Sequence, residues 1–265
     1  MEQKSRHRDR GAGLRSPVRN HYFYGQLLGV ESFELEAGYG IAQRRLLNRL
    51  VLGYGVVCGL GVRVLSGGRR IVIAPGLALD GWGREIVVPR ETDPIDVPRD
   101  VIDSALARAD DCDDEPCIQV LLCYHECLGD PQPALAGDCT TADPCAPSTV
   151  RERYRVRFRD RCDRPHDPCG EARLVSGGQI DHDRLAWWVT DRDCVRLPRD
   201  PCVPLANLRI HDPDDGHPHC DRDNVDIGVR RVVWSNLLLR ELLTAALEDG
   251  GGGGGGRGGY GDYEE

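Results

Sequence analysis

Cysteine is the residue type with the greatest capacity for chemistry in this sequence. All but one of the 12 cysteines fall in the range 112–220, within segments rich in Asp and Pro. Four thiolates at short spacing can bind Zn²⁺ tetrahedrally and close the coordination shell of a structural site. The candidate ligands are two closely spaced pairs, Cys112 with Cys117 and Cys123 with Cys127. Their spacings are wider than Cys-x-x-Cys, so a structural zinc ion is only one of the interpretations.

The same cysteines can serve as structural staples. Cys139 with Cys145, and Cys162 with Cys169, also bracket loops rich in Asp and Pro. Such pairs suit disulfides, buried thiols or thiolate ligands, and we favour the two structural roles over zinc, and zinc over a catalytic metal. Thiols stay reduced in the cytoplasm, whereas disulfides become available if the protein reaches the outside of the cell.

The sequence lacks the motifs of common catalytic sites. It contains no Gly-x-Ser-x-Gly, Walker loop or His-Glu-x-x-His pattern. A His-Pro-His-Cys run at 217–220 could ligate a metal, but a solvated loop is the favoured interpretation. The other histidines near acidic residues are His125, His166, His182 and His211. We therefore expect a protein that is not an enzyme and needs no cofactor.

Composition restricts the partners. A formal net charge of −9 argues against nucleic acid, because phosphate binding needs a basic surface. No apolar run approaches the length of a membrane-spanning helix. The first residues lack the apolar stretch of a secretory signal, so synthesis in the cytoplasm is expected. Residues 1–19 form a basic arm and residues 248–265 a Gly-rich acidic tail, and both are expected to be disordered.

A helical arm is predicted after an aromatic cluster at residues 22–24. The expected helix covers 32–50, with Ser32 as its N-cap. Gly38 and Gly40 would mark a kink or a close backbone approach. One apolar face is formed by Leu35, Tyr39, Ala42, Leu46 and Leu50. Together with its lead-in, this arm spans 20–60.

A β-hairpin module follows, because from residue 61 the apolar period changes to two. Strands are expected near 62–64, 71–73, 77–79 and 85–88. Glycine and proline supply the turns, and we expect unusual backbone angles at the Asp-Gly turn and at the glycine after it. The structural turn residues are Pro75, Gly76, Asp80, Gly81 and Gly83.

The sequence after the hairpin module predicts a β-rich domain with irregular insertions. Besides a short helix at 101–107 and a closing helix capped by Ser235, strands are predicted at 118–124, 154–158, 185–189 and 203–210. The strand at 154–158 carries arginines on its exposed face. Irregular Cys-rich excursions are expected at 125–147 and 159–183, and a polar loop at 212–223. The closing helix would bury a stripe made of Leu238, Leu239, Leu242, Leu243 and Ala246.

These elements predict an α+β protein that is mainly β. The expected platform, residues 61–247, is an antiparallel β-sandwich or a barrel-like domain with Cys-rich loop insertions. The helical arm precedes it and the closing helix ends it.

Several segments resemble proteins of contractile injection systems. Residues 21–28 (HYFYGQLL), 44–62 (RRLLNRLVLGYGVVCGLGV) and 74–88 (APGLALDGWGREIVV) are similar to a protein found in gene clusters of phage-tail-like particles. Residues 71–88 also resemble the base domain of phage tail-fibre and baseplate-attachment proteins. Such domains pair this hairpin with a later strand like VPLANLRI (203–210) and a closing VRR (229–231).

The resemblance covers residues 20–100 well and 185–247 loosely. It implies a baseplate-associated, fibre-adaptor or anchoring subunit that acts by protein–protein assembly, present in several copies within a particle that can be released. It brings no catalytic residue, and no fibrous repeat follows the module. Two alternatives stay open, namely a structural-zinc or metal-dependent module and a surface- or glycan-binding β-sandwich.

Overall fold

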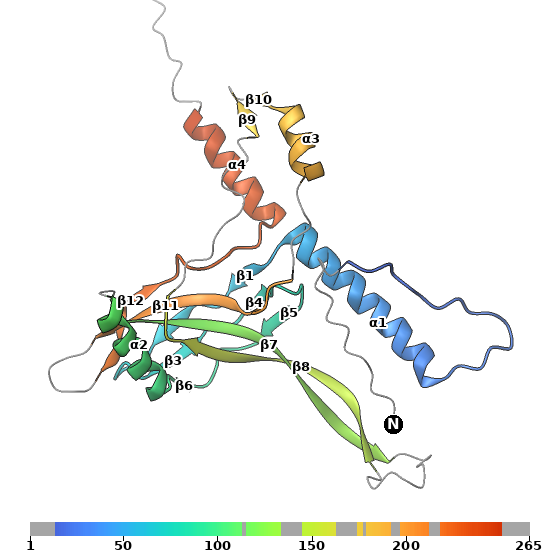
Figure 1. Cartoon of the computed structure of the whole chain (residues 1–265), viewed down its shortest axis with the longest axis horizontal. Coiled ribbons are helices and arrows are strands. Elements are labelled where there is room, and N and C mark those ends of the chain that lie inside the picture. Colours follow the sequence, from blue (N-terminus) through green and yellow to red (C-terminus); the bar gives the residue numbers. More distant parts are fainter. Residues whose placement is uncertain are drawn as a thin grey trace, which may run out of the picture. The chain divides into compact units, whose positions relative to one another are not determined.

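The computed structural model describes residues 14–112, 115–133, 145–162, 174–176, 179–191, 197–211 and 218–250 (Figure 1). The chain divides into two compact units, Met1–Val233 and Trp234–Glu265. The predicted fold class is confirmed, because the structure combines helices with mainly antiparallel sheets. The basic arm up to residue 13 and the tail from 251 lie outside the described residues.

The hairpin module forms two three-stranded antiparallel sheets. One has the order β1-β4-β5 and the other β2-β3-β6. The registers Val62↔Ile73 and Leu79↔Glu85 confirm both predicted hairpins. The strands are β1 (Gly55–Gly59), β2 (Val62–Val64), β3 (Arg70–Ile73), β4 (Gly76–Leu79), β5 (Glu85–Val88) and β6 (Ile95–Asp96).

A four-stranded antiparallel sheet follows, in the order β12-β11-β7-β8. Its strands are β7 (Cys117–Pro133), β8 (Cys145–Arg159), β11 (Val203–His211) and β12 (His219–Asp226). The first part of β7 lies between β11 and β8, as expected for the apolar run 118–124. Its second part pairs with β8 alone, and Figure 1 shows the two strands continuing there as a ribbon.

This ribbon corrects the expected irregular excursion at 125–147. The pairing runs from Tyr124↔Tyr154 to Pro133↔Cys145, so the described part of that range is strand. The strand signal is obscured by glycine, aspartate and proline, which are uncommon in strand interiors. A long two-stranded ribbon tolerates them because its outer edges are exposed. Most of the second excursion, 163–173 and 177–178, lies outside the described residues.

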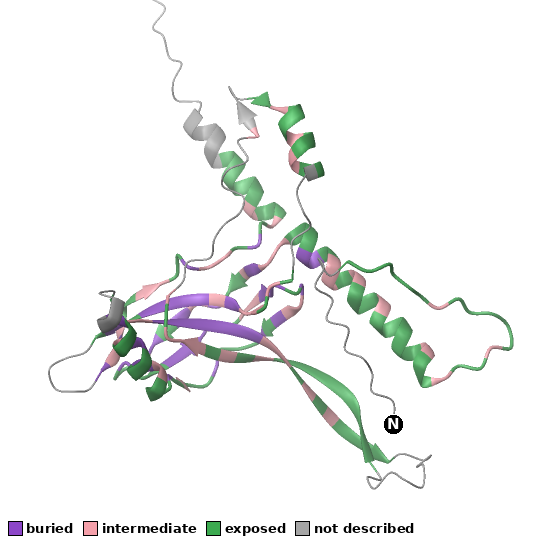
Figure 2. Cartoon of the chain, in the orientation of Figure 1, coloured by how far each residue is buried: buried purple, intermediate pink, exposed green. Residues whose placement is uncertain are grey.

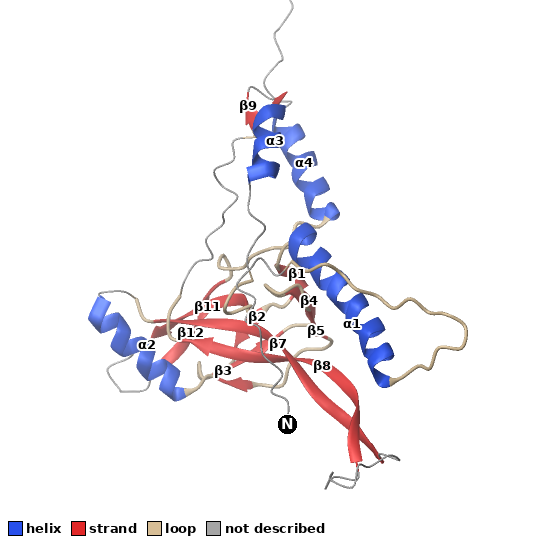
Figure 3. Ribbon diagram, turned by 45° about the vertical axis from the view of Figure 1, so that its right-hand side comes forward, coloured by secondary structure: helices blue, strands red, loops and turns tan. Residues whose placement is uncertain are grey.

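The hydrophobic core lies among the sheets of the first unit. Figure 2 shows buried residues concentrated in the middle of the sheets and exposed ones along the ribbon. β7 and β11 contribute Leu122, Leu205 and Leu208, each with no exposed surface. Helix α2 (Arg99–Cys112), which extends the predicted helix 101–107, packs against β7 (Figure 3). Its Ile102 completes the core.

The closing segment 229–231 ties the module to the sheet. Arg230 donates from Nε to the Leu205 carbonyl oxygen at 2.6 Å and from an Nη atom to the Leu60 carbonyl oxygen at 2.7 Å. The Val56 N–H donates to the Arg231 carbonyl oxygen at 2.8 Å. Three of the segments that carry the sequence resemblance therefore lie against one another, namely 44–62, 203–210 and 229–231.

Helix α1 (Val30–Leu47) begins earlier than predicted and passes into a π-helical turn, η1 (Asn48–Leu52). Gly29 occupies the N-cap position, so the prediction of Ser32 as N-cap is wrong. The helix continues through Gly38 and Gly40, and no atom lies within 4 Å of a Cβ built at either. The glycines therefore do not mark a close approach.

Two further predictions are wrong. Residues 185–189, expected as a strand, belong to helix α3 (His182–Asp191). Asp181 caps it, since its Oδ1 accepts from the Arg184 N–H at 3.0 Å, and this cap favours helix over the β-forming side chains. The expected polar loop 212–223 is strand β12 from residue 219, whereas 212–217 lie outside the described residues. Two short strands, β9 (Val175–Ser176) and β10 (Gln179–Ile180), pair with each other.

The second unit contains α4 (Asn236–Gly250). Ser235 is confirmed as its cap, because its Oγ accepts from the Leu238 N–H at 3.2 Å. The predicted buried stripe is wrong, since Leu239, Leu242 and Leu243 are exposed. The sequence pattern describes an apolar face correctly, but these three leucines of it are exposed among the described residues. None of the described helices is long and apolar enough to cross a membrane.

Candidate assembly interface

Helix α1 presents apolar side chains that the described residues of the chain leave exposed. None of its 18 residues is buried. At about 100° per residue, its apolar positions fall into two stripes on roughly opposite sides. The inner stripe comprises Leu35, Tyr39, Ala42 and Leu46, and the outer stripe comprises Val30, Phe33, Ala37, Ile41 and Leu47. The inner stripe was predicted from the sequence and the outer one was not, although Val30, Phe33, Ala37 and Ile41 follow one another at spacings of three and four residues.

The C-terminal end of α1 is fixed to the hairpin module by polar contacts. Asn48, which is buried, donates from Nδ2 to the Gly83 carbonyl oxygen at 3.0 Å and to Glu85 Oε1 at 2.8 Å. Arg44 Nε lies 2.8 Å from the same Glu85 oxygen. These contacts hold the last turn of the helix on the loop between β4 and β5.

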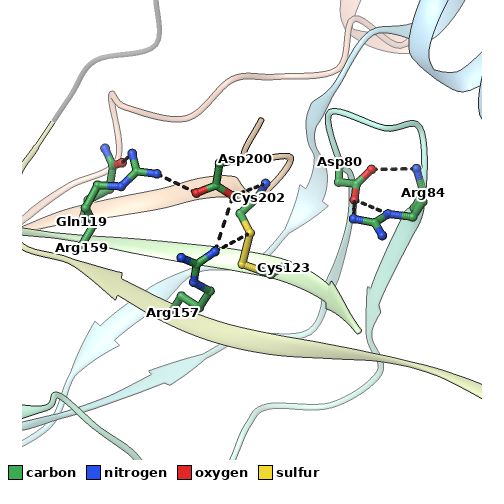
Figure 4. The surroundings of a disulfide bond; sticks show 8 residues. All are labelled: Asp80, Arg84, Gln119, Cys123, Arg157, Arg159, Asp200 and Cys202. Atoms are coloured by element: carbon green, nitrogen blue, oxygen red, sulfur yellow. Dashed lines mark hydrogen bonds and ion pairs between the residues drawn. A yellow bond between two sulfur atoms is a disulfide. The ribbon is translucent and has the colours of Figure 1, made fainter. Parts of the chain in front are cut away.

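A buried carboxylate shapes this loop. Asp80 has no exposed side-chain surface, and its Oδ1 accepts from the backbone N–H groups of Trp82 and Arg84, each at 2.9 Å. Its Oδ2 accepts from Arg84 Nε at 2.7 Å (Figure 4). The Arg84 guanidinium also lies over the rings of Trp82 at 4.7 Å and Tyr124 at 4.5 Å. The loop is therefore a rigid support for the helix.

At the predicted turn glycines, Gly76, Gly81 and Gly83, the main constraint is the lack of room for a Cβ atom. Only Gly83 has a left-handed backbone, with φ +80°, and a Cβ there would also meet the Arg45 carbonyl oxygen. Asp80 and Gly81 do not adopt positive φ, which corrects the expected unusual angles at that turn. A Cβ on Gly81 would lie 2.5 Å from Pro198 Cγ, and one on Gly76 would lie 2.6 Å from the Leu60 nitrogen. Glycine is therefore needed at these positions because neighbouring atoms lie close to where a Cβ would be.

A groove runs along the inner stripe. It has a volume of about 680 Å³ and is lined by Leu35, Tyr39 and Leu46 of α1. Trp82 and Leu197 line its other side, and both are 40% exposed. Residues 15–18 pass along it as well. Ile41 lines the groove as well, whereas Val30, Phe33, Ala37 and Leu47 do not. An apolar groove therefore lies on one side of α1, and an apolar ridge formed by these four residues lies on the other.

The cysteines pair over long sequence distances. Disulfides join Cys117 to Cys162, with Cα atoms 5.9 Å apart, and Cys123 to Cys202, with Cα atoms 4.5 Å apart. Cys127 is free, and the side chain of Cys112 is outside the described residues. The structure therefore does not assemble the four candidate zinc ligands, because a disulfide sulfur is not available as a thiolate ligand. Among the described residues, no group of three or more potential metal ligands occurs.

The second disulfide fastens the segment before β11 to the sheet (Figure 4). Beside it, Asp200 accepts from Arg159 Nη2 at 2.8 Å and lies 3.6 Å from Arg157 Nη1. Arg159 also donates to Gln119 Oε1 at 3.3 Å. The pairing of Cys123 with Cys202 follows from the antiparallel contact of β7 with β11, where Val203 is opposite Leu122.

The His-Pro-His-Cys run offers little reactivity. Cys220 is buried, and burial raises the pKa of its thiol to about 11. The thiol therefore stays protonated at neutral pH, and a protonated thiol is a poor nucleophile and metal ligand. The rings of His211 and His219 are 5.4 Å apart, whereas His217 is outside the described residues.

Comparisons with known proteins give distant likenesses only. No protein-family model and no curated protein matches the sequence. Among solved structures, the TssK–TssF–TssG baseplate subcomplex of the type VI secretion system matches 78% of this chain at 11% identity and a TM-score of 0.37, covering 60% of that chain. A crystal structure of TssK matches 78% of this chain at 10% identity and a TM-score of 0.36, covering 41% of that chain.

A third structure, the baseplate complex from the type VI secretion system, matches 88% of this chain at 12% identity and a TM-score of 0.38, covering 65% of that chain. The chain thus spans less than two thirds of the length of each of these matched chains. The likeness at these TM-scores is coarse, and the proposals below rest on this chain's own residues.

Proposed function

We propose that this protein is a non-enzymatic structural subunit of a contractile tail-like particle and assembles with further copies of itself through α1. The observation that carries the proposal is that α1 is fixed at one end to a rigid loop and yet buries none of its residues. Val30, Phe33 and Leu47 of the outer stripe are 69%, 61% and 58% exposed. Burying each such side chain stabilises a complex by about 1.5–3 kcal/mol.

The geometry favours a second copy as the occupant of the groove. Apart from Ile41, which lines the groove, the outer stripe and the groove lie on different sides of the same helix, so the outer stripe of one copy can enter the groove of the next. Such a contact is heterologous, because the two copies use different surfaces, and its repetition forms a ring when the rotation between successive copies closes. A ring also explains why α1 carries two apolar stripes, since each helix then has a neighbour on both sides.

Membership in a contractile particle is supported by the sequence resemblance. The resembling segments 44–62, 74–88 and 203–210 lie against one another around the closing residues 229–231. The two disulfides are in keeping with a particle that leaves the cytoplasm after synthesis, because disulfides persist in oxidising surroundings. No observation among the described residues favours the metal-dependent or glycan-binding alternatives.

Ring formation can be tested by sedimentation velocity of the full chain. Phe33→Asp places a charge on the outer stripe and should leave only monomer, whereas the wild-type chain sediments as a closed oligomer. Val189→Asp on α3 is the matched control, because Val189 is 64% exposed and Phe33 is 61% exposed. The control should sediment as the wild type does. A monomeric wild-type chain, or equal loss of mass in both variants, would contradict the ring.

Particle membership needs a separate experiment. Contractile particles purified from the source cells should contain this chain by mass spectrometry, and deletion of its gene should impair particle assembly or attachment. Particles that lack the chain and form normally after its deletion would refute this part of the proposal, whatever the sedimentation result.

A further inference from the structure

A ladder of arginines occupies one face of β8. Every second residue from 151 to 159 is an arginine, and alternate residues of a strand point to the same side of the sheet. The intervening Tyr154, Val156 and Phe158 pack against the core from the opposite face. The arginine ladder comprises Arg151, Arg153, Arg155, Arg157 and Arg159, of which all but the last are exposed.

The ladder has too few acidic partners within the described chain. Arg151 pairs with Asp130 at 2.7 Å, and Arg157 and Arg159 share the single carboxylate of Asp200. Arg155 contacts only the ring of His125, at 3.5 Å, and Arg153 has no polar partner among the described residues. The middle of the ladder therefore holds uncompensated positive charge on a chain whose net charge is −9.

A surface pocket of about 440 Å³ lies beside the middle of the ladder. Its lining includes Arg155 and Arg157 from the ladder, together with Arg84 and Arg199. Asp200 is the one acidic residue of that lining. Arg84 is paired with Asp80 and Arg157 with Asp200, so Arg155 and Arg199 supply the positive charge that favours a carboxylate or another anion in this concave surface.

The free edge of β8 lies next to the arginine ladder. β8 is the outermost strand in the order β12-β11-β7-β8, and no strand within the described ranges pairs with its other edge. The outward N–H and C=O groups of an edge strand can pair with an extended segment of another chain. In such a pairing, alternate side chains of the added segment lie beside the alternate side chains of β8.

We propose that the edge of β8 binds an extended acidic segment of a partner protein in which acidic residues alternate with uncharged ones. Alternate residues of a strand repeat every ~6.8 Å, so carboxylates at alternate positions match the guanidinium groups of the arginine ladder. Each match can form a charge-assisted hydrogen-bonded pair. Arg153 and Arg155 contribute most, because neither has a carboxylate partner of its own within the described chain.

An acidic protein segment fits this surface better than a single-stranded nucleic acid does. Proteins that bind single strands stack the bases on aromatic side chains. The aromatic residues of β8, Tyr154 and Phe158, face the core and not the arginine ladder. Tyr124 lines the adjacent pocket, but the Arg84 guanidinium already lies over its ring at 4.5 Å. The arginine-bearing face of β8 therefore offers charge beside free backbone groups, and no aromatic residue of β8 for stacking.

The test measures binding of a fluorescent peptide, in which Glu alternates with Thr, to the full chain at physiological salt. Arg153→Gln/Arg155→Gln should weaken binding at least about tenfold, as expected for two charge pairs. Arg70→Gln/Arg222→Gln, which changes two exposed arginines on β3 and β12, should bind like the wild type. A peptide with Gln in place of Glu should not bind, and one with its glutamates in a single block should bind more weakly.

Hydrogen exchange supplies the second readout, because an added strand should slow exchange of the outward amides of β8. Absence of wild-type binding, equal weakening in both double variants, or unchanged exchange in β8 would overturn the proposal. So would competition by single-stranded DNA that depends on Arg153 and Arg155. The inference is independent of the ring, since Phe33→Asp should retain full peptide binding.

Discussion

Two helices of this chain use their apolar residues in opposite ways. Helix α2 has 14 residues and buries Ile102 and Ala105 to 2% exposure each against the sheet. Helix α1 is longer, with 18 residues, and buries none. A single apolar stripe can be buried against one sheet, as in α2, whereas two stripes on roughly opposite sides need cover from two directions, and the described residues leave α1 exposed.

The largest expected effect is a difference in the free energy of unfolding between a substitution in α2 and one in α1. Ile102→Ala in α2 should lower the free energy of unfolding by about 2–4 kcal/mol, because it leaves a cavity in the core. Phe33→Ala in α1 should change it by less than about 0.5 kcal/mol in the monomer, because the side chain is exposed there. Urea unfolding in dilute solution measures both. A large loss for Phe33→Ala in the monomer would show that α1 is covered by its own chain.

A smaller effect concerns the loop that carries α1. Gly83→Ala should cost about 1–2 kcal/mol for its left-handed backbone and more for the collision with the Arg45 carbonyl oxygen. Gly67→Ala is the matched control, since φ is +89° there and nothing lies within 4 Å. Thermal unfolding gives the difference between the two costs, and limited proteolysis shows whether α1 is released. Equal costs without release would mean that the close approach does not hold the helix.

The smallest effect concerns Asp160, which anchors α2 by binding two of its side chains. Asp160 accepts from Ser104 Oγ at 2.6 Å and from Arg108 at 3.1 Å, and these bonds, in that order, lower the pKa of its carboxyl group. The lowered pKa stabilises the fold above the unfolded pKa of about 4, and the contribution disappears as pH falls through the folded pKa. Asp160→Asn should therefore cost about 0–1 kcal/mol at neutral pH.

The pH dependence gives a sharper readout for the same anchor. Melting temperatures of the wild type and of Asp160→Asn should converge as the pH falls from about 4 through the lowered pKa of the folded Asp160 carboxyl group, because the wild-type carboxylate becomes protonated only over that range. Glu115→Gln, which removes an exposed pair with Arg209, provides a control for loss of a surface charge. A constant difference across the pH range would show that the carboxylate charge is not involved.

Local signals in the sequence predicted much of the platform. The Pro75-Gly76 and Asp80-Gly81 turns, the apolar runs 118–124 and 203–210, and the Ser235 cap each depend on neighbouring residues, and the structure has the expected elements there. Helix α3 was not predicted because its Leu-Ala-Trp-Trp-Val run is also compatible with a strand. The cap that Asp181 provides at its N-terminus favours the helix.

The features that depend on distant residues could not be predicted. The disulfides join cysteines 45 and 79 residues apart, so short spacing suggested the wrong partners. The ribbon of β7 and β8 is formed by pairing across the range 134–144, which no local pattern reveals. The exposure of α1 depends on what the rest of the chain leaves uncovered. The sequence shows apolar stripes, but not which partner covers them.

Photo-crosslinking from Phe33 tests the central claim most directly. Benzoylphenylalanine in place of Phe33, in a mixture of chains with natural and heavy nitrogen, distinguishes crosslinks between copies from crosslinks within one copy. A ring predicts mixed-isotope crosslinks from position 33 to Trp82, Leu197 or Leu46 in the groove of a neighbouring copy. Crosslinks confined to single chains, or between copies at residues away from the groove, would contradict the account.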